Sequence, residues 1–364
     1  MRFFNCSIDE AIGKFRLKKI VFFGCGSWLN TINFSGFMAL KNNFNYAIDN
    51  KYTGIVCLGE KKLEVLPPSV LKDEKDCIVI LTSPVYMYDM YCQLKDLGVD
   101  DSVYCYAFPF MQLVTKKSDS VTLIEKVTTC VKPKIPKVIH CFWFSGDEKP
   151  ENYKRCIETW KEYLSEYKII EWNQNNYDCN KHPFLRRAID CGAWAFASDF
   201  ARLDVLNEYG GIYLDMDVEV FKSFDTLLEN EAILSFSNNV QIDLAVMGAV
   251  PHNAIIQKLL TIYDGVKIPD IKKEFSKFFQ PTLVKPTLVD CGIRMDGTLQ
   301  IVEGATVFSN EFFMPQDHVL FRPYIRTNHT YCNHLDNFGW SFSGNNKKEK
   351  KIHDNSILWN KIER

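Results

Sequence analysis

The sequence predicts an α/β protein of two domains, a small domain built on a parallel sheet followed by a larger α/β domain. Three observations support this fold class. The chain has 364 residues, which is more than one domain usually contains. Strand-like and helix-like patterns alternate along it. A polar, proline-containing stretch interrupts the alternation between about residues 115 and 135. We therefore expect a first domain at 1–120, a linker at 121–135 and a second domain at 136–364.

The strands of the first domain are predicted from short apolar runs separated by helix-like stretches. The clearest is Cys77–Thr82, a continuous run typical of a strand covered on both faces. The expected order is a strand at 18–23, a helix to about 41, a strand at 44–50, a short helix from 67, a strand at 77–82, a helix at 85–97 and a strand at 102–106. This alternation indicates a small, doubly wound parallel sheet.

A glycine turn follows the first of these strands. Gly24-Cys25-Gly26 ends the strand and opens a helix, and Asp49 ends the second strand. This arrangement is typical of dinucleotide-binding loops, but the third glycine is Leu29 here and Trp28 is bulky beside it. The domain resembles the small Rossmann-like modules of some bacterial sugar-nucleotide and polysaccharide enzymes. Two roles stay open for it: nucleotide binding, or packing, regulation and assembly.

The second domain is expected to begin with a strand at 138–144. A helix at 152–166, a strand at 168–172 and a helical region at 183–209 follow. The end of this helical region is predicted to be amphipathic, because apolar residues recur at the spacing of one helix face: Phe196, Phe200, Leu203 and Leu206. Gly210-Gly211 ends the helix, since glycine tolerates the backbone conformation of a helix stop, and Ile212–Leu214 forms the next strand.

Two carboxylates, Asp215 and Asp217, stand one residue apart at the end of this short strand. Residues i and i+2 of a strand point to one face, so both side chains can reach one site. Hard divalent cations prefer carboxylate ligands, and such a cation stabilises the charge that grows on a diphosphate leaving group. Ligands of open α/β sheets bind outside the carboxyl ends of the strands. The pattern favours sugar transfer from a nucleotide-activated donor over an acidic turn, which is the other interpretation of a lone D-x-D.

Asp199 and Arg202 lie on the helix before this strand, three residues apart and on one helix face. An exposed ion pair, worth roughly 0.3 kcal/mol, would be the simpler interpretation. The alanines and phenylalanines around the pair predict that it is at least partly buried, which favours a functional role.

Together these motifs resemble glycosyltransferase family 32, which includes bacterial capsular polysaccharide enzymes and the fungal mannosyltransferase that starts outer chains. The resemblance is carried by segments that occur in order along the second domain: Ile135–Gly146, Cys156–Trp160, Glu171–Asn173, Ser198–Arg202 and Gly210–Asp217. The same core is similar to the catalytic domains of large clostridial glucosylating toxins. The resemblance implies a GT-A fold, a nucleotide-sugar donor, dependence on Mn²⁺ or Mg²⁺ and retention of anomeric configuration.

By position, the resemblance implies that Asp217 is the direct metal ligand and that Asp215 contacts the metal, the ribose and the sugar. Asp199 and Arg202 correspond to contacts with the donor sugar and the diphosphate. These four residues form the expected catalytic group. Trp143 corresponds to the indole that stacks on the nucleobase, a role that suits a flat ring at a strand end. A core tryptophan is the other interpretation of Trp143.

Further donor contacts are expected from Asn173 and from a region near the end of the sequence. Enzymes of this kind often place His or Ser, followed by Trp, in that region to complete the metal–diphosphate shell. Here His334 and Trp340 fit that pattern, although the residue before Trp340 is Gly339. We expect His334 as the third metal ligand and Trp340 as a donor contact. No catalytic nucleophile can be chosen, so transfer is expected to depend on positioning and electrostatic stabilisation.

Composition limits the partners and the compartment. The 43 basic and 45 acidic residues argue against a nucleic-acid-binding protein. The 13 cysteines lack paired spacing and predict free thiols in a reducing compartment. No secretory signal or membrane span is predicted. We expect a cytoplasmic enzyme, with peripheral association at the inner face of the membrane. It would move a hexose from a UDP-linked donor to a saccharide or lipid-linked saccharide in capsule or lipopolysaccharide synthesis.

Three other functions stay open. A toxin-like glucosyltransferase that modifies proteins would share the chemistry and differ in its acceptor. An NAD-dependent enzyme that modifies nucleotide sugars would use the first domain and require a catalytic Tyr-x-x-x-Lys pattern, which we do not identify in the sequence. A non-enzymatic sensor of nucleotide sugars would have no need of the intact pair Asp215 and Asp217.

Overall fold

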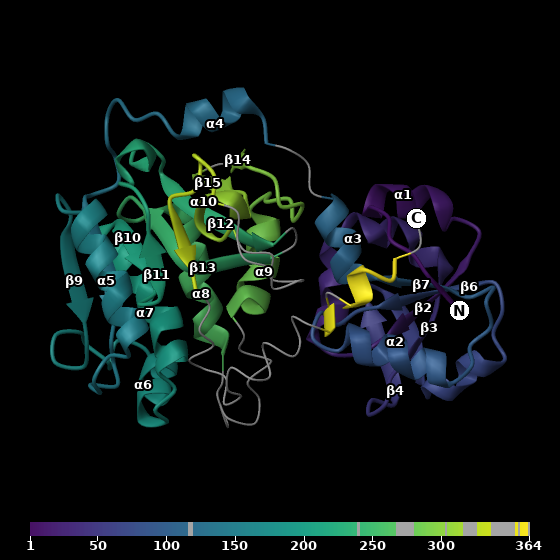
Figure 1. Ribbon diagram of the computed structural model, residues 1–364. Coiled ribbons are helices and arrows are strands. Elements are labelled where there is room, and N and C mark those ends of the chain that lie inside the picture. Colours follow the sequence, from purple (N-terminus) through teal and green to yellow (C-terminus); the bar gives the residue numbers. More distant parts are fainter. Residues whose placement is uncertain are drawn as a thin grey trace. The chain divides into compact units, whose positions relative to one another are not determined.

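The structure of the protein is a computed structural model (Figure 1), which describes residues 1–115, 119–238, 241–266, 280–302, 304–315, 326–335, 354–355 and 357–362. The chain forms two compact units. The first contains the described residues of Met1–Lys116 and Ser343–Arg364, and the second contains those of Lys117–Gln316 and Tyr324–Phe342. The predicted α/β class is confirmed in both units.

The first unit is built on a seven-stranded sheet with the order β1-β7-β6-β2-β3-β5-β4. Neighbouring strands are parallel except for the hairpin of β4 and β5 at one edge. Its strands are β1 (Arg2–Phe3), β2 (Lys19–Phe23), β3 (Phe44–Ile48), β4 (Gly54–Leu58), β5 (Lys61–Leu66), β6 (Cys77–Leu81) and β7 (Tyr104–Ala107). Its helices are α1 (Ile8–Lys14), α2 (Met87–Asp96) and α3 (Phe108–Thr115), with the 3₁₀ helices η1 (Ser27–Phe34), η2 (Gly36–Asn43) and η3 (Pro68–Lys72).

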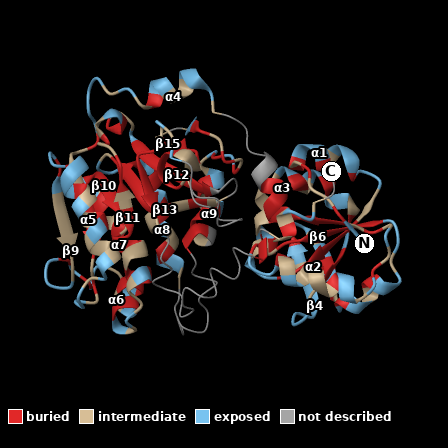
Figure 2. Cartoon of the chain, in the orientation of Figure 1, coloured by how far each residue is buried: buried red, intermediate tan, exposed pale blue. Residues whose placement is uncertain are grey.

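Two apolar clusters cover the two faces of this sheet, and the central strands are buried along their length (Figure 2). One cluster includes residues from a segment far along the chain. Leu358 is fully buried in it, and Trp359 packs edge-on against Phe110 with ring centroids 4.9 Å apart. Asn355 donates a hydrogen bond to the Pro84 carbonyl at 3.1 Å. The expected second domain, 136–364, thus differs from the structure, because residues 354–355 and 357–362 belong to the first unit and add Leu358, Trp359 and Ile362 to its core.

Side chains and backbone groups of the protein itself occupy the space around the glycine turn of the first unit. Gly24 has a φ of +105°, and a Cβ there would lie 2.6 Å from Thr82 Oγ1 and 2.8 Å from Met90 Cε. The Asp49 carboxylate, which would bind the ribose if this were a dinucleotide site, accepts hydrogen bonds from backbone N–H groups, including that of Cys25 at 2.8 Å. The helix that follows the turn is a 3₁₀ helix. These contacts favour the packing role of this unit over nucleotide binding.

The spacing Tyr-x-x-x-Lys does occur in this unit, at Tyr91 and Lys95. Tyr91 is buried and packs edge-on against Phe3, with ring centroids 5.3 Å apart. Lys95 donates to the Met1 carbonyl at 3.2 Å. Both side chains therefore have structural contacts, and the pair gives no support to a dehydrogenase in this unit.

The second unit is built on another seven-stranded sheet, with the order β14-β15-β12-β13-β10-β8-β9. β9, β8 and β10 are parallel neighbours, and β13 pairs antiparallel with β10. The strands are β8 (Val138–Phe142), β9 (Lys168–Trp172), β10 (Gly211–Leu214), β12 (Ala232–Asn238), β13 (Gln241–Ala249), β14 (Gln300–Val302) and β15 (Ala305–Phe308). A separate antiparallel pair joins β11 (Val218–Val220) to β16 (Cys332–His334). This layout, in which parallel and antiparallel pairings are mixed, is consistent with a GT-A type domain.

Helices cover this sheet: α4 (Val121–Val127), α5 (Glu151–Tyr163), α6 (Pro183–Asp190), α7 (Trp194–Tyr209), α8 (Ala254–Thr261), α9 (Gln280–Asp290) and α10 (Asn310–Phe313), with the 3₁₀ turns η4 (Asp225–Leu227) and η5 (Ile262–Gly265). α4 lies within the expected linker, 121–135, and belongs to the second unit. Just before it, the Asp119 carboxylate accepts hydrogen bonds from Leu299 N–H at 2.7 Å and the Ser309 hydroxyl at 2.5 Å.

The helical region predicted at 183–209 is divided at Gly192, where φ is +63°, into α6 and α7. The expectation that α7 is amphipathic is wrong. Its buried residues include Arg202 and Val205 besides the four apolar positions of the predicted face. The reason is that α7 contacts β8, β10 and β13 as well as α6 and α8. Contacts on several sides thus bury a charged residue, Arg202, along with the apolar ones.

The glycine pair after α7 is required by the close packing of β10. Gly210 and Gly211 have φ values of +64° and +106°. A Cβ on Gly210 would lie 2.6 Å from Pro251 Cδ, and one on Gly211 would lie 2.7 Å from the Val138 carbonyl oxygen. Glycine is therefore needed at both positions, for the backbone conformation and for space.

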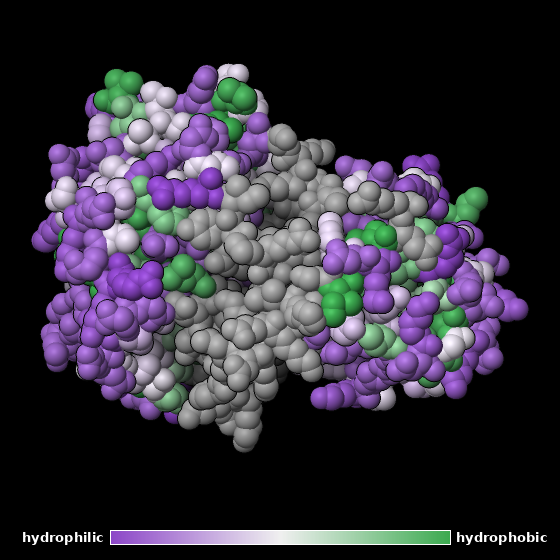
Figure 3. Space-filling model, viewed as in Figure 1, coloured by the Kyte–Doolittle hydropathy of each residue, from purple (hydrophilic) through white to green (hydrophobic). Residues whose placement is uncertain are grey.

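No helix in the described part of the chain is long and apolar enough to cross a bilayer. On the face drawn in Figure 3, hydrophilic residues cover most of the described surface, and apolar residues are scattered. All 13 cysteines lie in described segments, and all are free thiols.

Candidate functional site

The predicted acidic pair lies directly after β10. Asp215 N–H donates to the Ala245 carbonyl at 2.8 Å, which continues the pairing of β10 with β13 for one residue. The chain then turns, because Val218 N–H donates back to the Asp215 carbonyl at 3.1 Å. Asp217 therefore lies in a turn between β10 and β11. The turn brings its carboxylate close to that of Asp215, without a continuous strand through both residues.

His334 reaches this turn from the far end of the described chain. The pairing of β11 with β16 places it opposite Val218, and Leu335 N–H donates to the Asp217 carbonyl at 3.0 Å. His334 Nε2 lies 3.2 Å from Asp217 Oδ1 and 4.0 Å from Asp215 Oδ2. The structure thus brings together the three residues that the sequence suggested as metal ligands.

The geometry of this group fits a divalent cation. One ligand atom from each of Asp215, Asp217 and His334 lies within 4.8 Å of the others. The side chains of Asp217 and His334 are each 11% exposed, and that of Asp215 is 25% exposed. Two carboxylates and one imidazole are a donor set that protein-bound divalent cations accept. These three residues could hold Mn²⁺ or Mg²⁺ at an accessible edge of the site.

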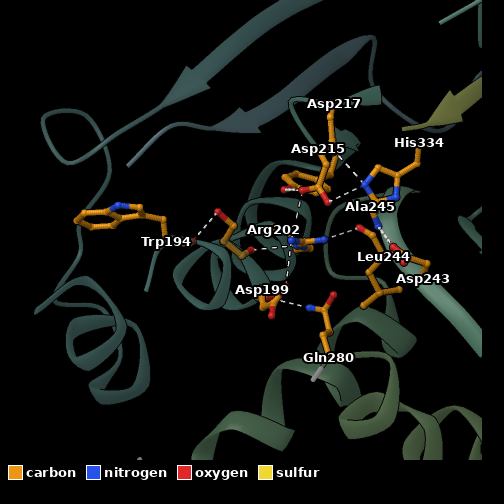
Figure 4. Close-up of polar contacts among 12 residues, drawn as sticks. Trp194, Asp199, Arg202, Asp215, Asp217, Asp243, Leu244, Ala245, Gln280 and His334 are labelled. Carbon is orange, nitrogen blue, oxygen red and sulfur yellow. Dashed lines mark hydrogen bonds and ion pairs between the residues drawn. The ribbon is translucent and has the colours of Figure 1, made fainter. Parts of the chain in front are cut away.

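Arg202, on α7, contacts the first residue of the acidic pair, Asp215 (Figure 4). Its Nη2 lies 3.0 Å from Asp199 Oδ1 and 3.3 Å from Asp215 Oδ1. Its Nη1 donates to the Leu244 carbonyl at 2.9 Å, and its Nε donates to the Ser198 carbonyl at 3.1 Å. The Arg202 and Asp199 side chains are only 6% and 14% exposed, so the prediction of a buried pair is confirmed.

The charges of this cluster depend on one another. Burial raises the pKa of Asp199 to about 7, with Arg202 acting in the opposite direction and Asp215 adding to the rise. Burial also raises the pKa of Asp215, against the effects of Arg202 and His334. Burial disfavours the charge of Arg202, but Asp215, Tyr213 and Asp199 raise its pKa above the usual value. Arg202 is thus a permanent, fixed positive charge beside the candidate metal ligands.

Tyr213 is part of this site and was missed in the sequence. Its hydroxyl donates a hydrogen bond to Asp215 Oδ1, and the Arg202 guanidinium carbon lies 4.6 Å from the centre of its ring. The two-residue period of a strand could have predicted it, because Tyr213 in β10 and Asp215 directly after β10 point to the same face.

Trp143 and Asn173 lie at the ends of β8 and β9. Trp143 is half-buried, and its indole N–H donates to the Asp147 carbonyl at 2.7 Å. Lys149 Nζ lies 5.5 Å from the centre of the Trp143 ring. The Asn173 carboxamide accepts a hydrogen bond from Asn175 N–H at 2.8 Å, which gives it a structural role in a turn. Base stacking by Trp143 and donor binding by Asn173 stay predictions, and Trp340 lies outside the described residues.

His140 supports the glycine pair through a hydrogen bond to its backbone. Its Nδ1 accepts a hydrogen bond from the Trp172 indole N–H at 3.0 Å, so its Nε2 carries the proton and donates to the Gly210 carbonyl at 2.9 Å. The His140 ring also stacks on Trp172 and Tyr209. A protonated ring would place an N–H against the indole N–H, so the neutral tautomer is the one that fits.

Acid is expected to destabilise the second unit through His140. Burial lowers its pKa below 6.5 in the folded protein, against the hydrogen bond to Gly210. A histidine with a depressed folded pKa contributes stability above its unfolded pKa, and that contribution is lost as the pH falls toward the folded pKa. We expect the melting temperature to fall between about pH 7 and pH 5, a window around the unfolded histidine pKa of about 6.5. A His140→Gln variant should be less stable at pH 7 and show a shallower fall, measured by calorimetry; equal slopes would contradict this.

Comparison with known proteins identifies the segment that contains most of this site. Residues 150–234 match the family described as a glycosyltransferase sugar-binding region containing a DXD motif. The matched segment includes Asp199, Arg202, Asp215 and Asp217, whereas Trp143 and His334 lie outside it.

Two curated relatives are similar to this chain over longer stretches, of 154 and 167 residues. Inositol phosphoceramide mannosyltransferase 2 of Schizosaccharomyces pombe is 29% identical over 154 residues, which cover 41% of this chain and 42% of that protein. Mannosyl phosphorylinositol ceramide synthase SUR1 of Saccharomyces cerevisiae is 25% identical over 167 residues, or 44% of each chain. The chain thus spans less than half the length of these relatives. A solved structure, the PaToxG glycosyltransferase, covers 45% of this chain and 74% of its own at 20% identity and a TM-score of 0.33.

Proposed function

We propose that this protein is a metal-dependent glycosyltransferase that transfers a hexose from a nucleotide-diphosphate sugar. The observation that carries the proposal is the convergence of Asp215, Asp217 and His334 at the end of β10. Most of that site lies in the segment that matches a DXD glycosyltransferase region. Mn²⁺ or Mg²⁺ held by the three residues would neutralise charge on the diphosphate.

The residues around the candidate metal ligands add a fixed positive charge and a hydrogen bond to the site. Arg202 is held by two carboxylates and two backbone carbonyls, so its guanidinium needs no reorganisation to stabilise negative charge nearby. Tyr213 fixes the Asp215 carboxylate through its hydroxyl. Asp199, on the other side of Arg202, is the proposed contact to the donor sugar. On this proposal, retaining transfer depends on positioning and on fixed charges, and no side chain acts as a nucleophile.

The similarity to inositol phosphoceramide mannosyltransferases favours a lipid-linked acceptor over a capsular polysaccharide. The proposed donor is a UDP-hexose, and a GDP-hexose is the other donor to test. A lipid-linked acceptor also fits the expected location at the inner face of a membrane. A toxin-like protein glucosyltransferase would share the donor chemistry, so an acceptor assay with lipids and proteins separates the two.

Thermal-shift measurements with UDP-, GDP- and CMP-sugars test the donor and the metal together. A ligand that binds only the folded state raises stability, by about 2.7 kcal/mol at one hundred times its Kd. We expect one nucleotide-sugar class to raise the melting temperature in the presence of Mn²⁺ or Mg²⁺, and a chelator to abolish both the shift and donor hydrolysis. Turnover that persists in chelator would contradict the proposed metal dependence. The absence of any shift across the panel would contradict the proposed donor class.

A further inference from the structure

The inner face of α5 runs beside the acidic turn. Trp160 Nε1–H donates to the Val218 carbonyl at 2.7 Å, and the Thr159 hydroxyl accepts from Val220 N–H at 3.0 Å. These bonds attach the second half of α5 to β11, directly after Asp217. Tyr153 lies seven residues before Trp160 and therefore on the same helix face, about two turns nearer the start of α5.

Tyr153 lies between the two ends of the proposed donor site. On one side its ring meets the Trp143 indole edge-on, with centroids 5.7 Å apart and an interplanar angle of 89°. On the other side it is within electrostatic reach of the acidic pair. Burial, followed by the charges of Asp217 and Asp215, raises the pKa of Tyr153 to about 12. The phenol thus keeps its proton at neutral pH and is available as a hydrogen-bond donor.

The Tyr153 hydroxyl is unpaired among the residues that the structure describes. The side chain is half-buried, and within the described part of the chain its hydroxyl makes no hydrogen bond. A half-buried phenol whose ring meets an indole, and whose charge state responds to two nearby carboxylates, has surroundings that suit a substrate-binding residue. A tyrosine needed only for packing would bury its ring equally well without the hydroxyl.

We propose that Tyr153 is a further donor-binding residue, which holds the Trp143 indole with its ring and donates its hydroxyl to the phosphate next to the ribose. The inference rests on the proposed function. A nucleoside diphosphate carries its base, ribose and two phosphates in that order. If the base lies on Trp143 and the diphosphate lies at Asp215 and Asp217, the ribose and the first phosphate occupy the intervening space that Tyr153 borders.

Binding of nucleotide fragments to Tyr153→Phe tests this proposal. Calorimetric titrations in Mn²⁺ would use the uridine series (uridine, UMP and UDP) and the guanosine series. We expect Tyr153→Phe to weaken binding of the monophosphate and the diphosphate roughly tenfold, and to leave nucleoside binding within about twofold. Tyr153→Ala should weaken binding of all three fragments, because Trp143 loses its edge contact. Tyr163→Phe, on the exposed end of α5, is the matched control and should resemble the wild type.

The outcomes separate this inference from the proposed function. If the wild type binds nucleotides and Tyr153→Phe binds UMP and UDP as tightly as it does, the hydroxyl has no role and the inference is wrong. Equal weakening of nucleoside and nucleotide binding in Tyr153→Phe would likewise overturn it, because the loss would then come from packing. A wild type that binds no fragment of either series would overturn the proposed function, and this inference with it.

Discussion

Replacing Asp217 by asparagine is expected to lower turnover by about 10²- to 10³-fold and to leave the melting temperature within about 2 °C of the wild type. The carboxylate lies 3.2 Å from His334 Nε2 and is one of three converging candidate metal ligands. Asparagine keeps the shape of the side chain and removes the charge. Because Asp217 raises the pKa of Asp215 by repulsion, removing that charge relieves a cost in the folded protein. Mn²⁺ affinity should fall together with turnover.

The matched control is Asp190→Asn, the same change at an exposed carboxylate of the same unit that pairs with Arg186. It should leave turnover and Mn²⁺ affinity unchanged. A loss of turnover in Asp217→Asn that follows a large fall in melting temperature would indicate a structural role. Turnover within tenfold of the wild type at saturating metal would show that Asp217 is dispensable as a ligand.

Replacing Leu358 and Trp359 together by alanine is expected to destabilise the first unit by about 4 to 6 kcal/mol. Leu358 is fully buried in the cluster on one face of the sheet, and Trp359 packs on Phe110. Leucine and tryptophan truncations in cores each cost about 2 to 5 kcal/mol, and neighbouring residues add incompletely. A loss of this size approaches the whole stability of a small domain. Calorimetry should show a transition of the first unit that moves sharply to lower temperature.

The control for this pair is Ile55→Ala on β4, where the side chain is 66% exposed. It should shift the transition by no more than about 0.5 kcal/mol. If the double variant behaves like this control, residues 354–362 are not part of the folded core. A second measurement distinguishes local from global loss, since donor binding by the second unit should persist in the double variant.

The sequence was a good guide where local patterns are strong. The continuous apolar run at Cys77–Leu81 became a central strand, as expected for a strand covered on both faces. The hairpin of β4 and β5 was missed. Its strands lie at the sheet edge, and Lys61, Lys62 and Glu64 interrupt the apolar pattern there. The amphipathic reading of α7 was wrong for a related reason: a helix covered on several sides loses the one-sided pattern.

Local patterns likewise predicted one part of the candidate site, and contacts between distant segments determined the rest. The sequence alone determined that Asp215 and Asp217 follow an apolar strand and that Asp199 and Arg202 share a helix face, because those relations depend on residues close together in the chain. Only the tertiary structure decided that Arg202 is buried beside two carboxylates and that Tyr213 bonds to Asp215. It further assigned residues 354–355 and 357–362 to the first unit. It also decided the position of His334, since the pairing of β11 with β16 joins segments whose separation leaves no periodic signal in the sequence. Contacts of that kind form when distant surfaces pack, and no local pattern specifies them.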